Sequence, residues 1–198
     1  RFKFGIPSKK KRADYAFIQH MHSILNDTGK AAIISSSGTL FREKGEREIR
    51  KALIETDHVE CIIALPDNLF YATGIPACII LLNKNKPKKR SKKILFVYAA
   101  KDYDDLTKRD KLRDSDIKKI ESTIKEFKNI EKYCYVADEE DIKENDYNLN
   151  VSRYVDISEE EEEINMQKIY SELIELKSKN EQLWNDTKKN LKSFGVKI

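Results

Sequence analysis

Apolar residues in the first hundred positions follow two different patterns. Residues 13–26 repeat apolar side chains every three or four positions, which predicts an amphipathic helix. A second such stripe, on Ile49, Ala52 and Leu53, predicts another helix. Three shorter runs are continuously apolar, as in strands covered on both faces, and they span residues 31–35, 59–65 and 77–83. Because helices and strands alternate, we expect an α/β fold with a parallel sheet.

The connection between the second and third of these strands is short. Residues 66–76 leave no room for the helix that a parallel crossover requires, so we expect the two strands to be antiparallel neighbours. The loop contains NLFYATG, which is rich in aromatic and small residues. A further strand is expected at residues 92–100, after a basic loop.

The chain changes character at residue 101. Residues 101–157 are highly charged, and they predict one amphipathic helix, a short strand and an irregular, tyrosine-rich arm. The apolar stripe of that helix consists of Ile117, Ile120, Ile124 and Phe127. We therefore expect three parts, formed by residues 1–100, residues 101–157 and a C-terminal helix over residues 158–198.

The C-terminal helix has the features of a coiled coil. Ser158 and Glu161 are spaced as a capping box at its start. A seam then repeats at intervals of three and four residues, with Asn180 as a polar position within it: Met166, Ile169, Leu173, Leu176, Asn180, Leu183 and Thr187. We expect Ile169, Leu173, Leu176, Asn180 and Leu183 to form a subunit interface. The alternative is that the helix folds back onto its own domain.

The net charge of +4 is unevenly distributed along the chain. Residues 1–100 hold 19 Lys and Arg against 9 Asp and Glu, whereas residues 101–198 hold 19 against 25. Two clusters, Lys9–Arg12 and Lys86–Lys93, carry much of the positive excess. Such clusters suit nucleic acid as a partner, although they also fit ordinary solvated loops.

The remaining composition argues against metal, disulfide and membrane chemistry. Cys61, Cys78 and Cys134 are odd in number and lack CxxC spacing, which predicts buried, reduced thiols. His20 and His22 are two residues apart and cannot share a helix face as ligands, so no metal site is expected. No run approaches the ~18 apolar residues of a membrane span. We expect a cytoplasmic protein.

Four stretches of the chain resemble a known family. They are FKFGIP with ADYAFIQHM, LFREKGEREIRKALIE, LPDNLFYATGIPACIILLNKNKP and ENDYNLNVSRYVD. Together they are similar to the modification (M) subunit of type I restriction–modification systems, an adenine-N6 DNA methyltransferase. The resemblance implies a class I S-adenosylmethionine-dependent methyltransferase (Rossmann-like) sheet. Residues 31–35, 59–65 and 77–83 would then be its fifth, sixth and seventh strands, and a helical tail would follow.

Two motifs of that family do not occur in these 198 residues. No glycine-rich turn of GxG type and no Asn-Pro-Pro-Phe sequence is present. We therefore expect the C-terminal half of a methyltransferase domain, inactive alone and unable to bind S-adenosylmethionine tightly. Strand 31–35 would have a bare edge, which invites self-association of the fragment.

The resemblance also implies a role for the aromatic loop. An enzyme that methylates adenine N6 must extrude the base from the duplex, and the base then needs an aromatic face to stack on. By its spacing before the strand at residue 77, Phe70 is the first candidate and Tyr71 the second. The alternative is that Phe70 only plugs the base of the hairpin. DNA phosphate contacts would come from the two basic clusters, through Lys9, Lys10, Lys11, Arg12, Lys88, Lys89 and Arg90.

The sequence allows more than one role for several polar residues near the expected sheet edge. Asp14 and Tyr15 could shape the cofactor pocket, or could serve as a helix N-terminal charge and a packing ring. Ser35 to Ser37 end a strand where ligands collect in α/β folds. A serine nucleophile is not supported, because G-x-S-x-G is absent.

The partners implied by the resemblance are DNA, a specificity subunit, a second modification subunit and, where one exists, a restriction subunit. The alternative function is a non-catalytic interaction module that binds a specificity subunit through the C-terminal helix. The DNA recognition sequence lies with the specificity subunit.

Overall fold

The computed structural model describes residues 2–7, 13–71, 73–104, 110–158 and 166–194. Residues 1–158 form one compact unit and residues 159–198 form a second. The boundary predicted at residue 100 lies inside the first unit, because the segment after it adds a strand to the sheet and packs on its face.

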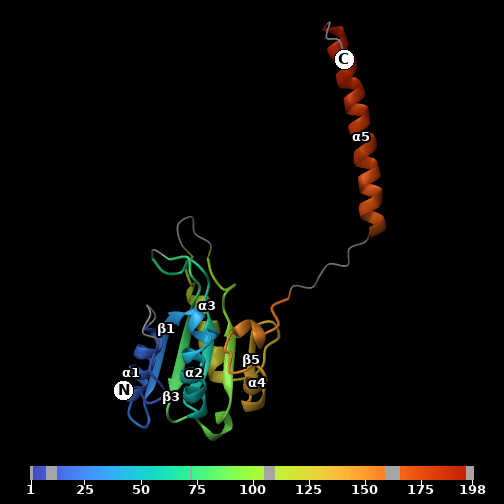
Figure 1. The fold of residues 1–198 in the computed structure, drawn as a ribbon. Helices are drawn as coiled ribbons and strands as arrows, with labels where there is room; N and C mark the ends of the chain where they lie inside the picture. Colours follow the sequence, from blue (N-terminus) through green and yellow to red (C-terminus); the bar gives the residue numbers. More distant parts are fainter. Residues whose placement is uncertain (1, 8–12, 72, 105–109, 159–165, 195–198) are drawn as a thin grey trace. The chain divides into compact units, whose positions relative to one another are not determined.

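The first unit is built on a five-stranded sheet with the order β1-β3-β2-β4-β5 (Figure 1). The strands are β1 (Lys30–Ser36), β2 (Val59–Ala64), β3 (Ala77–Asn83), β4 (Ile94–Tyr98) and β5 (Cys134–Ala137). Strand β3 is antiparallel to both β1 and β2, which confirms the predicted hairpin. The sheet is mixed, because the predicted common direction holds for β1, β2 and β4 but not for β3 and β5. Among the described strand pairs only β2–β4 is parallel, because β3 and β5 run against their neighbours.

Helices cover both faces of this sheet (Figure 1). On one face lie α1 (Asp14–Ile24), α2 (Gly45–Glu55) and the short α4 (Glu139–Glu144), and their apolar side chains share one core with Cys78, Ile80 and Leu82 of β3. On the other face lies α3 (Asp114–Glu126), whose Ile120 packs with Leu95 and Val97 of β4. Successive side chains of a strand point to opposite faces, so one continuous apolar run contributes side chains to the cores on both faces of the sheet.

The tyrosine-rich arm is part of the first core. A 3₁₀ turn at Val151–Arg153 buries Val151, and the ring of Tyr154 stacks on Phe96 of β4 with centroids 3.8 Å apart. The backbone amide of Leu149 donates to the carbonyl of Leu40 at 2.9 Å. The arm therefore packs on the same face of the sheet as α1 and α2, where it covers part of the core.

Arg50 of α2 binds the backbone of the tyrosine-rich arm. Its side chain is 1% exposed, and its guanidinium donates to the carbonyl oxygens of Tyr147 at 2.6 Å and of Arg42 at 2.9 Å. A longer contact of 3.4 Å reaches the carbonyl of Thr39. Arg50 thus joins the segment that holds Thr39 and Arg42 to Tyr147 of the arm, which is distant from it in the sequence.

Replacing Arg50 with Met should destabilise the chain by about 2–4 kcal/mol. Methionine fills a similar space but leaves the buried carbonyls of Tyr147 and Arg42 without a donor, and hydrogen bonds to a charged group contribute about 1.5–3 kcal/mol each. Urea denaturation measures the difference. The matched control is Arg47→Met on the same helix, whose partners Asp146 and Glu48 are exposed, and which should leave the midpoint nearly unchanged. Equal losses in the two variants would contradict this account of Arg50.

A histidine pair connects α1 to the start of β2. Nε2 of His22 lies 2.8 Å from Nδ1 of His58, and the ring of Phe4 packs edge-on against His22. Burial, and next the neighbouring His58, lowers the pKa of His22 from 6.5 to about 4. Burial also lowers the pKa of His58.

This pair should make the fold acid-sensitive. The unfolded chain binds a proton on His22 near pH 6.5, whereas the folded chain does so only near pH 4, so stability falls as the pH drops through this window. Urea midpoints measured from pH 7 to pH 4 should decline more steeply in the wild type than in His22→Gln, which keeps a polar partner for His58 but does not titrate. Parallel declines would assign the acid sensitivity to other groups.

Candidate functional site

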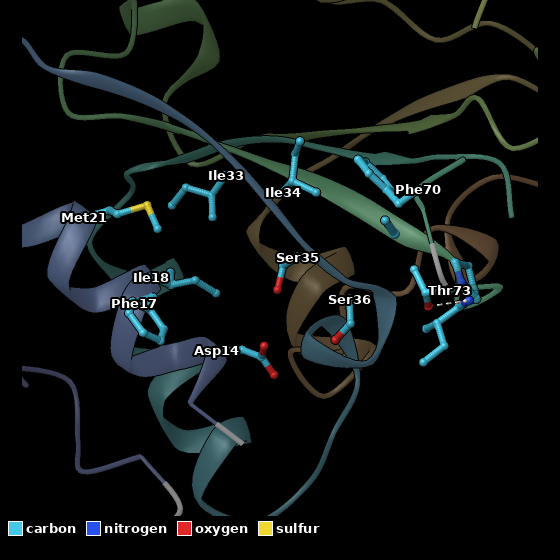
Figure 2. A pocket seen from close by; sticks show the side chains of 13 residues that line it. Asp14, Phe17, Ile18, Met21, Ile33, Ile34, Ser35, Ser36, Phe70 and Thr73 are labelled. Carbon is cyan, nitrogen blue, oxygen red and sulfur yellow. Dashed lines mark hydrogen bonds between the residues drawn. The ribbon is translucent and has the colours of Figure 1, made fainter. Parts of the chain in front are cut away.

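A hollow of about 450 Å³ opens beside the carboxyl end of β1 (Figure 2). Within the described sheet β1 pairs only with β3, so this end of the molecule lies next to a strand edge without a strand partner. Most of the lining is apolar and comes from α1, β1, the loop before β3 and the first residue of β3: Phe17, Ile18, Met21, Ile33, Ile34, Phe70, Ile75, Pro76 and Ala77. The polar lining consists of Asp14, Ser35, Ser36 and Thr73.

The position of Phe70 is compatible with both of its predicted roles, stacking on a base and filling the base of the hairpin. Its half-buried ring lines the hollow, and it also packs against the core between the sheet and α3. Tyr71 is 82% exposed and is not part of the hollow's lining. The structure therefore brings Phe70, and not Tyr71, to this site.

The loop that carries Phe70 is tightly folded. The hydroxyl of Thr73 accepts a hydrogen bond from the amide of Ile75 at 3.1 Å. A side chain at Gly74 would place its Cβ 2.9 Å from Oδ1 of Asn68, so this position favours glycine for packing reasons. The end of the loop, from Thr73 to Ile75, is thus held by a hydrogen bond of its own.

Two of the polar residues that line the hollow, Asp14 and Ser36, are bound by an arginine that the sequence analysis did not single out. We call Asp14, Ser35, Ser36 and Thr73 the polar wall. Arg42 binds the carboxylate of Asp14, and its Nε donates to Oε2 of Glu46 at 2.5 Å. Its Nη1 also donates to the hydroxyl of Ser36 at 3.3 Å. Burial lowers the pKa of Arg42, but the hydrogen bonds and charges of Glu46 and Asp14 outweigh burial and leave that pKa raised. The spacing of Arg42 and Glu46, four residues apart, was the one sequence signal for this cluster.

The neighbouring Tyr15 has a structural role. It is 2% exposed, and its hydroxyl donates to the carbonyl of Thr39 at 2.8 Å. Burial raises its pKa. Of the two residues considered at the start of α1, only Asp14 reaches the hollow.

Among the described residues predicted to contact DNA, Lys88, Lys89 and Arg90 do not line the hollow. Lys9, Lys10, Lys11 and Arg12 lie outside the described residues. Lys88 and Lys89 are exposed on a turn that follows β3, at the opposite end of that strand from the hollow, about 20 Å away by strand geometry. Arg90 binds Glu60 at 2.9 Å and lies over the ring of Phe127, so its guanidinium has protein partners. DNA contact by these residues stays a prediction.

The three cysteines are buried and form no disulfide, as predicted. In the described part of the chain, His, Cys, Asp and Glu side chains do not gather in a group of three that could hold a metal ion. The helices described there are also too short or too polar to cross a membrane.

The second unit contains the long helix α5 (Met166–Ser193). Within this unit the apolar residues of its predicted seam are uncovered, with exposed fractions from 51% at Ile169 to 72% at Met166. Within the capping box predicted at its start, Glu161 lies outside the described residues. The helix is confirmed over residues 166–193, and its role as an interface stays a prediction.

The fold and site place the chain in a recognisable class. Strand β3 runs in reverse between β1 and β2, which share one direction, and the hollow lies at the carboxyl end of β1, so the chain is a mixed α/β protein with a pocket at a sheet edge. Residues 1–163 match the family described as N-6 DNA Methylase, and the chain belongs to this family.

Its relatives are methylase subunits of type I restriction–modification systems. The chain is 41% identical to the type I restriction enzyme MjaVIII methylase subunit of Methanocaldococcus jannaschii, over 88% of this chain and 30% of that protein. It is 38% identical to the HindI methylase subunit of Haemophilus influenzae, over 98% of this chain and 46% of the relative. The chain thus spans less than half the length of these relatives.

A solved structure supports the same relationship. The methyltransferase subunit of a type I restriction–modification system from Streptococcus thermophilus superimposes with a TM-score of 0.73 and 39% identity. The match covers 77% of this chain and 32% of that protein.

Proposed function

We propose that this chain forms the DNA-facing part of the catalytic domain in a type I modification subunit, which transfers a methyl group from S-adenosylmethionine to adenine N6. The observation that carries the proposal is the hollow at the carboxyl end of β1, where Phe70 meets an apolar wall. An extruded purine needs such a wall, because its faces lose their stacking neighbours when the base leaves the duplex.

Cofactor binding and the methyl-transfer motif are assigned to parts of the intact subunit beyond these residues. Neither a GxG turn nor Asn-Pro-Pro-Phe occurs in the 198 residues, and the match of 178 residues covers 30% of the M. jannaschii relative. The chain alone is therefore proposed to bind S-adenosylmethionine weakly and to be inactive. DNA, a specificity subunit, a second modification subunit and, in a complete system, a restriction subunit are its proposed partners.

Phe70→Ala, made in the intact subunit within its complex, should lower kcat/KM for DNA methylation roughly 10- to 100-fold. Stacking of a base on an aromatic side chain contributes about 1–3 kcal/mol, and each 1.36 kcal/mol corresponds to a factor of ten. Incorporation of labelled methyl groups into DNA measures the rate. Fluorescence of 2-aminopurine at the target position reports base extrusion independently.

The matched control for Phe70 is a leucine. Phe70→Leu keeps an apolar plug at the hairpin but removes the aromatic face, whereas Phe70→Trp keeps the face. If Phe70 stacks on the base, the leucine variant fails and the tryptophan variant works. Full activity of Phe70→Leu would contradict stacking and leave the ring as a packing element.

A second candidate function is a subunit-binding module, and it is favoured by the exposed seam of α5. Leu173 is 60% exposed and Leu183 is also 60% exposed, although both are large apolar side chains on one stripe. A helix with such a stripe gains most of its stability from a partner surface.

The double variant Leu173→Asp, Leu183→Asp should abolish co-purification with the specificity subunit, because it places two carboxylates in an apolar interface. The control is Ser171→Asp with Ser178→Asp, two positions on the opposite side of the same helix. Size-exclusion chromatography of the mixed subunits measures the outcome. Association that survives the leucine changes would exclude the seam as the interface.

A further inference from the structure

A second, smaller hollow of about 120 Å³ opens at the other end of the sheet, and we call it the distal hollow. Its floor consists of the first residues of β2 and β4, Val59 and Ile94, and of Ile142 in α4, and all three are buried. The half-buried Ile54 and Tyr147 complete the apolar lining. Because β1, β2 and β4 share one direction, the distal hollow lies at the opposite end of the sheet from the first one.

The volume of the distal hollow limits the size of its occupant. Sites for cofactors and drug-sized ligands enclose about 300–1,000 Å³. A cavity of roughly 150 Å³ lined by aliphatic and aromatic side chains accommodates benzene. At about 120 Å³, the distal hollow therefore suits a single apolar side chain of leucine or phenylalanine size and is too small for a nucleotide.

Hydrogen bonds fix the rim of the distal hollow. The carboxylate of Asp57 accepts a hydrogen bond from the amide of Lys92 at 2.8 Å and another from Nζ of Lys86 at 2.5 Å. The side chain of Lys86 is only 3% exposed. The amide of Tyr147 donates to the carbonyl of Ile142 at 2.9 Å, which ties this part of the arm to α4. A pocket with fixed walls needs little ordering when a ligand enters.

Two ammonium groups at the rim share one carboxylate. Nζ of Lys92 lies 2.9 Å from one oxygen of Glu139, and Nζ of Lys143 lies 2.8 Å from the other. The hydrogen bond from Lys143, and next that from Lys92, lowers the pKa of Glu139 to about 2, so this carboxylate is ionised at neutral pH. Two positive charges thus meet one negative charge at this point of the rim. The side chains of Lys92 and Lys143 are 71% and 52% exposed, and a second carboxylate can reach them from solvent.

The charge on the rim differs from one side to the other. The exposed Glu55, the last residue of α2, also lines the distal hollow and repels an incoming carboxylate. An acidic group is therefore favoured beside Lys92 and Lys143 and disfavoured beside Glu55. A DNA phosphate would satisfy the lysines but would leave the apolar floor in contact with water. A polypeptide that carries an apolar side chain next to an acidic one satisfies both features.

We propose that the distal hollow is a docking site for a segment of a partner protein, which inserts one leucine- or phenylalanine-sized side chain and presents a neighbouring carboxylate to Lys92 and Lys143. The inference goes beyond the proposed function and does not depend on it. In interfaces of this kind a single anchor in a pocket carries most of the affinity, and polar contacts around it exclude water. A partner bound here would leave the hollow at the carboxyl end of β1 free.

The test uses the intact subunit and three capped tripeptides, followed by saturation-transfer NMR, which detects weak ligands. Ac-Asp-Phe-Gly-NH2 should bind, and its ring protons should receive the strongest saturation. Ac-Asn-Phe-Gly-NH2 lacks the charge and should bind roughly 3- to 5-fold more weakly, as expected for an exposed ion pair. Ac-Asp-Ala-Gly-NH2 lacks the anchor and should bind roughly 10- to 100-fold more weakly, because little apolar surface is buried.

Variants at the rim and the floor locate the bound peptide. Glu139→Gln should tighten binding of the Asp-Phe peptide roughly 2- to 5-fold, because the two ammonium groups no longer share a protein carboxylate. Lys143→Glu should weaken binding at least as much, whereas the control Lys118→Glu, at an exposed position of α3, should change nothing. Ile54→Trp fills the distal hollow and should abolish binding, with DNA methylation unchanged.

Three results would overturn the inference. The first is equal affinity for the three peptides. The second is a Lys143→Glu variant that binds the Asp-Phe peptide as well as the Lys118→Glu control does. The third is displacement of the peptide by a duplex oligonucleotide, which would assign the lysines to DNA. If Ile54→Trp does not fold, Glu139→Gln still decides, because it changes an exposed side chain, and weaker or unchanged binding there contradicts the proposed role of the lysines.

Discussion

The reversal of β3 is the constraint on which the rest of the first unit depends. Because β3 enters between β1 and β2 from the opposite direction, its start lies at the carboxyl end of β1. The short loop that precedes it, with Phe70, is therefore held beside Ser35 and Ser36. A parallel strand at this place would need a crossover helix, and the loop would then lie at the other end of the sheet. The site exists because the connection is too short for that helix.

The reversal of β3 could be predicted from the sequence. The pairing of β5 with β4 and the packing of the tyrosine-rich arm on the sheet could not. The lengths of the apolar runs and of the 66–76 connection predict β1, β2, β3 and their hairpin, since these depend on local periodicity and loop length. The order of the strands depends on contacts between distant residues. The pairing of β5 with β4, and the stacking of Tyr154 on Phe96, brought residues 134–155 into the first unit although their composition suggested a separate part.

Two arginines link this late segment to the hollow. Arg50 holds the carbonyl of Tyr147 in the arm and the carbonyl of Arg42, while the side chain of Arg42 holds Asp14. A chain of hydrogen bonds thus runs from the tyrosine-rich arm to the polar wall. Neither arginine stood out in the sequence, because each lies on or beside an ordinary amphipathic helix. Only burial distinguishes Arg50, at 1% exposed, from Arg47 on the same helix.

Charge is where sequence reasoning was weakest, for a physical reason. A cluster such as KPKKRSKK predicts a basic surface, but each long side chain can turn toward whatever carboxylate the fold brings near. Lys86 does so with Asp57 at 2.5 Å, and Arg90 does so with Glu60 at 2.9 Å, so part of the cluster serves the junction between β2 and β4. Pairing of this kind removes charge from the field that a polyanion would meet. Any attraction for DNA in this cluster therefore depends on the exposed Lys88, Lys89 and Lys93, and should be screened by salt.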